Sequence, residues 1–107
     1  MEKHTREKLK SFLGTGKVFS GEKLLGEGTY HIDVYQEFIE GQAPTGTYRV
    51  PGLKVIVGTM RGPFPIGVIL KLVTTDGDTL PFFIAESNTG RLEASGPFLT
   101  KEGKFVV

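Results

Sequence analysis

The sequence predicts an all-β fold, either a small antiparallel barrel or a two-sheet sandwich of six to eight short strands, with a short N-terminal helix or arm. From Lys17 onward, apolar residues recur at every second position, which is the period of a strand buried on one face. Glycines and prolines interrupt this pattern at short intervals, as turns between antiparallel strands do. A length of 107 residues suits one hydrophobic core. We therefore expect a single domain over residues 1–107.

The N-terminal segment is the one helical candidate. Within residues 2–13, the apolar residues Leu9, Phe12 and Leu13 fall at i, i+3 and i+4, the spacing of one helix face. Gly14 would end the helix. Because so short a helix is marginal in water, we expect residues 1–15 either to dock on the barrel or to fray as a flexible arm. An open α+β sheet covered by this helix is the alternative architecture.

Strand signals are clearest in the middle of the chain. The segment from Gly28 to Ile39 alternates apolar and polar residues, with Tyr30, Ile32 and Val34 on one face. Pro51 and Gly52 separate two further strand segments, 47–50 and 53–57. Because proline donates no backbone hydrogen bond, it predicts a break, a bulge or an edge there. Gly-Thr-Tyr occurs at 28–30 and again at 46–48, which we interpret as a turn glycine followed by strand-forming residues.

The C-terminal half predicts further strands. Ile66–Thr74 is apolar on both faces, as a central strand is. Asp76-Gly77 is typical of a type I′ hairpin turn, with Leu80–Ala85 as the returning strand. Arg91–Ala94 and a short segment at the C-terminus complete the pattern.

The amino-acid composition limits the cellular compartments and the partners that we expect. The chain has no cysteine, so it has no thiol nucleophile, zinc finger or disulfide framework, which favours a reducing, cytoplasmic location. It also contains neither the apolar run of a secretory signal nor a stretch long enough to cross a bilayer, so we expect no membrane partner. The net charge of +1 implies no general attraction to nucleic acid.

Few residues carry a recognisable chemistry. No segment fits a phosphate-binding loop, a calcium loop or a nucleophile elbow. We therefore expect no catalytic residues, no cofactor and no resident metal.

His31 is the one histidine in a strand context. Asp33, Tyr35 and Glu37 share its face, but successive positions on one face lie about 6.5–7 Å apart. One imidazole with carboxylates is also a poor transition-metal set. A solvated polar face is the simplest interpretation, and a metal or small-ligand site at His31 and Asp33 is the lowest-ranked hypothesis.

The leading functional hypothesis is a non-catalytic intracellular binding module for another protein or for a second copy of the chain. The prolines at 63 and 65 would hold Phe64 rigidly in a loop, close to Arg61, so this pair is the first partner-binding candidate.

Single-stranded nucleic-acid binding is the alternative function. Residues 41–75 contain no acidic residue, and cations interleaved with aromatics on a barrel face would hold phosphates and bases. The candidate residues are Tyr48, Arg49, Lys54, Arg61 and Lys71.

Overall fold

The computed structural model describes residues 2–107 and consists of one antiparallel sheet that closes on itself. Its strands are β1 (Lys3–Ser20), β2 (Lys23–Ala43), β3 (Gly46–Arg61), β4 (Leu70–Thr74), β5 (Thr79–Glu86) and β6 (Arg91–Ala94). They follow the order β1-β2-β3-β6-β5-β4, and β4 pairs with β1 to complete a ring. The all-β class is confirmed. Residues 2–107 contain no helix, and therefore none long and apolar enough to span a membrane.

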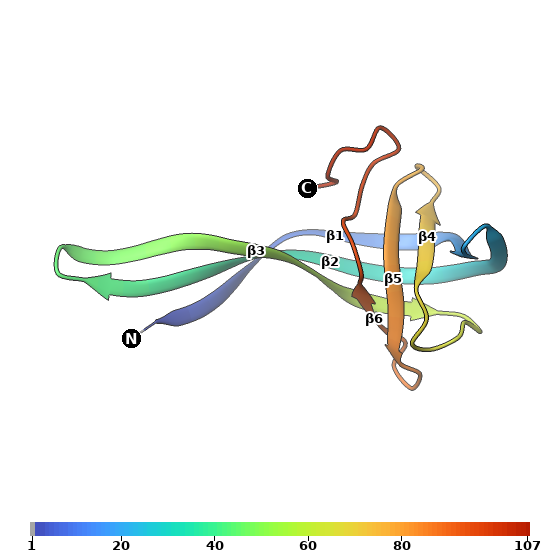
Figure 1. Ribbon diagram of the computed structural model, residues 1–107, viewed down its shortest axis with the longest axis horizontal. Helices are drawn as coiled ribbons and strands as arrows, with labels where there is room; N and C mark the ends of the chain where they lie inside the picture. The colour runs from blue at the N-terminus through green and yellow to red at the C-terminus, as the bar shows by residue number, and fades with distance from the viewer. Residues whose placement is uncertain (1) are drawn as a thin grey trace.

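The first three strands are much longer than predicted, at 18, 21 and 16 residues. Strands β4 to β6 cross them steeply on one side, and the remaining length of β1 to β3 projects beyond the ring (Figure 1). We call this projection the arm, made of residues 3–10, 35–43 and 46–55. The molecule accordingly measures 56 × 33 × 21 Å.

The N-terminal segment is a strand, so the prediction of a helix or a fraying arm at residues 1–15 is wrong over the described residues. Strand β1 pairs with β2 from Lys3 opposite Glu40 to Ser20 opposite Lys23. The side chains of the expected helical stripe are not buried together, because Leu9 is 40% and Leu13 72% exposed.

Glycine hides the strand period of β1 in the sequence. The side chains of β1 that face the ring interior, in order, belong to Phe12, Gly14, Gly16 and Val18. The Tyr30 ring lies over Gly14, and a side chain on Gly16 would collide with Leu72. The missing side chains thus make room for larger neighbours, so half of the inward positions show no hydrophobic signal.

The ring interior is filled by apolar side chains from all six strands and from the segments that follow β3 and β6. The buried cluster contains Val18, Tyr30, Ile32, Met60, Phe64, Leu70, Leu72, Leu80, Phe82, Ile84, Leu92 and Phe98. The rings of Phe12 and Phe98 lie 4.9 Å apart. The alternation expected for residues 28–39 is confirmed near the ring, since Ile32 is buried while His31 is exposed.

Two predictions in the C-terminal half need correction. Strand β4 begins at Leu70, because Gly67 adopts a φ of +76° and its N–H donates to Ile84 O at 3.0 Å outside the ladder. Residues 66–69 therefore form a loop. The hairpin at Asp76-Gly77 is confirmed. Its turn is not type I′, because that type needs a positive φ at both residues, and Gly77 has one while Asp76 does not.

The expected irregularity at Pro51 is confirmed as a bulge. Strand β3 continues through it, but the register shifts where Gln36 pairs with Lys54 and Phe38 pairs with Pro51. The Gln36 side chain donates a hydrogen bond to Gly52 O at 3.0 Å. A side chain of the neighbouring strand thus supplies a hydrogen bond to a backbone carbonyl group within the bulge.

Replacing Gly16 by alanine tests the inward orientation of β1. The new methyl group would meet Leu72 and the backbone of Val73, so Gly16→Ala should lower the free energy of unfolding by about 1–3 kcal/mol. Denaturant unfolding measures this. Thr15→Ala, on the exposed side of the same strand, is the matched control. Equal stability of Gly16→Ala and the wild type would contradict this packing.

Candidate functional site

One side of the arm continues the outer surface of the ring. Residues directly opposite each other in an antiparallel pair project to the same side, so the strand register defines this surface. We call it the outer arm face, and its residues are His4, Arg6, Lys8, Tyr35, Glu37, Ile39, Tyr48, Val50 and Val55. Tyr48 is 39% and Val50 44% exposed. The face therefore presents apolar side chains to water at its centre and along β3.

The Gly-Thr-Tyr repeat has a shared structural role. Tyr48 lies across Gly41 of β2, where an added side chain would collide with the ring. Tyr30 covers Gly14 of β1 in the same way. An aromatic ring over a cross-strand glycine protects a stretch of backbone that has no side chain of its own.

Cations border the outer arm face along β1. The Arg6 guanidinium and the Lys8 ammonium lie 5.8 and 5.9 Å from the centre of the Tyr35 ring. Arg6 also forms an ion pair of 3.6 Å with Glu37. The charge on this border is therefore largely compensated within the chain.

Within residues 2–107, neither edge of the arm pairs with a further strand, and both edges carry features that disfavour strand addition. Strand β4 pairs only with residues 16–19 of β1, and β6 only with residues 57–59 of β3. The β1 edge is rich in lysine and is interrupted by a bulge at Leu9, and the β3 edge carries Pro51 and its bulge. Lysine, proline and bulges at an edge disfavour pairing with another strand, so a partner would meet a face of the arm.

The inner side of the arm is polar. Arg49 stacks 3.6 Å from the centre of the Phe38 ring. Its guanidinium lies 3.0 Å from Glu40 and 3.4 Å from Glu7. Arg49 is thus already paired with two carboxylates.

The residues considered for nucleic-acid binding do not lie on one face. Lys54 donates to Val107 O at 2.7 Å, and Lys71 lies on β4 with its ammonium 5.4 Å from the Phe19 ring. Arg61 is at the opposite end of β3 from Arg49, and Tyr48 is on the outer arm face. The structure therefore assembles no continuous basic and aromatic surface from these five residues.

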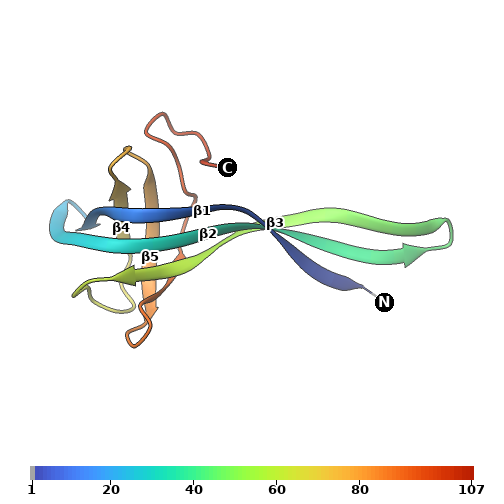
Figure 2. The same cartoon turned by 180° about the vertical axis from the view of Figure 1, so that it is seen from behind.

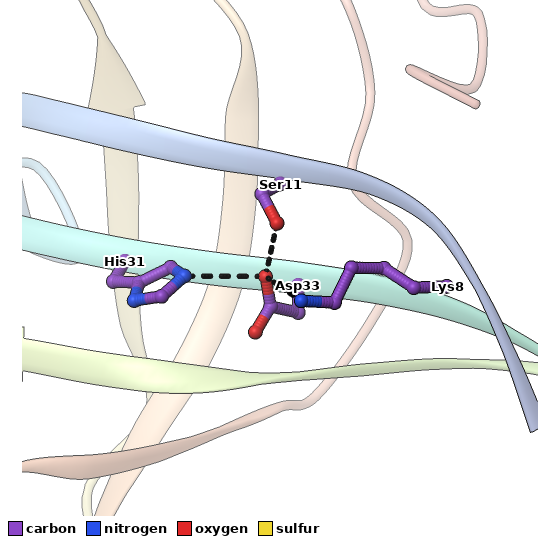
Figure 3. A network of polar contacts seen from close by, with 4 residues as sticks. All are labelled: Lys8, Ser11, His31 and Asp33. Atoms are coloured by element: carbon purple, nitrogen blue, oxygen red, sulfur yellow. Dashed lines mark hydrogen bonds and ion pairs between the residues drawn. The ribbon is translucent and has the colours of Figure 1, made fainter.

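A polar cluster centred on Asp33 lies on the outer surface where the ring meets the arm (Figure 3). Ser11 Oγ donates to Asp33 Oδ1 at 2.5 Å, and His31 Nε2 lies 3.2 Å from the same oxygen. Lys8 Nζ is 3.7 Å away. The sequence singled out His31 and Asp33 but not Ser11 or Lys8, because both belong to β1, which was expected to be helical.

The environment of Asp33 stabilises its charged form. The hydrogen bond from Ser11 is the main cause that lowers the pKa of Asp33, and Lys8 and His31 add to it, while burial acts in the opposite direction. The carboxylate thus ties β1 to β2 at the base of the arm.

This arrangement differs from that of a serine nucleophile with its base. Ser11 and His31 both contact Asp33 Oδ1, so the hydroxyl proton points to the carboxylate instead of to the imidazole that would have to accept it. Within residues 2–107, no group of three or more His, Asp or Glu side chains is placed to hold a metal ion.

Arg61 and Phe64 meet at a pocket of about 610 Å³ at the end of β3 away from the arm. Its lining residues are Met60, Arg61, Gly62, Phe64, Ile66, Ile84, Ser87, Asn88, Thr89 and Gly90. Phe64 is only 8% exposed and belongs to the core, so its ring is not presented to a partner as the loop hypothesis required. Arg61 remains exposed at the rim.

Comparison of the chain with known protein families, curated proteins and solved structures gives no match.

Removing the Ser11 hydroxyl tests the Asp33 cluster. Ser11→Ala should raise the pKa of Asp33 towards its ordinary value, as measured by NMR titration of the carboxyl group. Because a lowered pKa stabilises the fold only where Asp33 is ionised, the variant should lose about 0.5–1.5 kcal/mol above about pH 4. This difference should vanish as the pH falls through the folded-state pKa. An unchanged Asp33 titration in Ser11→Ala, with Thr15→Ala as the control, would contradict the assignment.

Proposed function

We propose that this chain is a non-catalytic binding module that associates with a second copy of itself through the outer arm face. The observation that carries the proposal is the arm itself, a three-stranded projection whose apolar outer side is open to solvent. In Figures 1 and 2, no other described segment lies over it. Covering apolar side chains releases water and favours association.

The packing of the arm alone gives it little stability. A sheet wetted on both faces lacks the second layer that normally buries its apolar side. Half-buried Tyr35, Ile39 and Val55 therefore contribute less than they would beneath a partner surface. Association would supply the missing layer.

The paired charges of the outer arm face favour binding of a second copy of the chain over binding of a strongly charged partner. Arg6 pairs with Glu37 and Lys8 with Asp33 at 3.6 and 3.7 Å. Little unpaired charge is left to repel an identical face or to require an opposite one. The protected edges favour face-to-face contact over strand addition.

The size of the face predicts the strength of the association. Three strands with a spacing of about 4.8 Å and a length of about 30 Å offer roughly 400 Å² per copy, or about 800 Å² for two. Stable specific interfaces bury about 1,200–2,000 Å². The expected association is therefore reversible and dependent on concentration.

Sedimentation velocity over a range of protein concentrations tests this function. The wild type should associate as concentration rises, and Val50→Lys should weaken the association at least about tenfold, because it would bury an unpaired charge. Thr47→Lys places the same charge on the inner side of the same strand and should behave as the wild type. A wild type that stays monomeric at every concentration, or a Val50→Lys variant that associates normally, would contradict the proposal.

A further inference from the structure

We call the cavity at Arg61 and Phe64 the Arg61 pocket. Backbone hydrogen bonds hold the segments that surround it in place. The N–H of Met60 donates to Gly90 O at 2.8 Å, which holds the β5–β6 turn against the end of β3. The N–H of Gly67 donates to Ile84 O at 3.0 Å, which holds the β3–β4 loop against β5. The cavity is therefore framed by segments that are hydrogen-bonded to the strands of the ring.

The floor of the pocket is apolar and closely packed. Met60, Phe64 and Ile84 are only 1%, 8% and 3% exposed. The Phe64 ring occupies space left by Gly28 and Gly62, where an added side chain would collide with it. The floor thus belongs to the core of the ring, and the apolar side chain that the pocket exposes is Ile66, at 51%.

The rim is polar and carries one cation. Ser87, Asn88 and Thr89 lie on the β5–β6 turn, and Arg61, at the end of β3, lines the same pocket. Among residues 2–107, no ion pair involves Arg61. The carboxylate closest in sequence to the turn, Glu86, lies 3.8 Å from Arg91 and does not line the pocket.

From this geometry we infer that the Arg61 pocket binds a small organic anion, namely a carboxylate joined to an apolar group. A guanidinium recognises a carboxylate through two parallel hydrogen bonds, and the hydroxyl and amide groups of the turn can donate further ones. The apolar part of the ligand packs on Ile66, which lines the pocket and is 51% exposed. The pocket volume of about 610 Å³ falls within the range of roughly 300–1,000 Å³ that is typical of small-molecule sites.

This site is independent of the proposed self-association. It lies at the end of β3 opposite the arm, so one function can fail without the other.

NMR titration with benzoate, an aromatic ring carrying one carboxylate, tests the inference. Benzoate should shift the backbone amide signals of the non-proline residues within 60–67 and of residues 84–90 in a saturable way. Benzyl alcohol keeps the ring without the charge, and acetate keeps the charge without the ring, and both should bind at least about tenfold more weakly. Absence of saturable shifts with benzoate, or equal binding of benzyl alcohol, would overturn the inference.

Two arginine variants locate the site. Arg61→Gln removes the charge at the exposed rim and should weaken benzoate binding about tenfold or more. Arg49→Gln removes a charge on the arm and should leave benzoate binding unchanged. The spectrum of each variant without ligand reports whether the fold is intact. Wild-type affinity in a folded Arg61→Gln variant would refute the role of Arg61.

Discussion

The continuous antiparallel pairing of β1 with β2 is the constraint on which the rest of the structure depends. It runs from Lys3 opposite Glu40 to Ser20 opposite Lys23, so it includes both the ring and the arm. At one end, it places β1 where β4 can pair with it and close the sheet. At the other end, it gives the β2–β3 hairpin a third strand, without which the projection would be a two-stranded ribbon of marginal stability.

The ring and the arm use the same strands for different purposes. In the ring, the inward side chains of β1 to β3 meet those of β4 to β6 and form the buried cluster. In the arm, no other described segment covers the outer side of the strands (Figures 1 and 2). Local contacts stabilise the arm in place of a core: Tyr48 over Gly41, Arg49 stacked on Phe38, and cations beside Tyr35. The two candidate binding surfaces consequently lie at opposite ends of β3.

The sequence predicted those parts of the fold that local patterns determine. The strand around Ile32, the irregularity at Pro51 and the hairpin at Asp76-Gly77 follow from alternation, from the missing proline N–H and from turn chemistry. The helix was wrong because the helix-like spacing of Leu9, Phe12 and Leu13 arises in a strand where Leu9 lies at a bulge and Leu13 faces outward. Because β1 was misassigned, Ser11 and Lys8 could not be placed beside Asp33. The contacts of Ser11 and Lys8 with Asp33 also depend on the register between two strands about twenty residues apart, which local sequence patterns do not give.

Cross-strand NMR contacts between β1 and β2 in the arm test the central claim most directly. The structure predicts contacts between Thr5 and Phe38 and between Glu7 and Gln36, with slow amide exchange where the two strands are hydrogen-bonded. Sequential contacts of the i to i+3 type over residues 3–13, or random-coil chemical shifts there, would contradict the pairing on which both the ring and the arm depend.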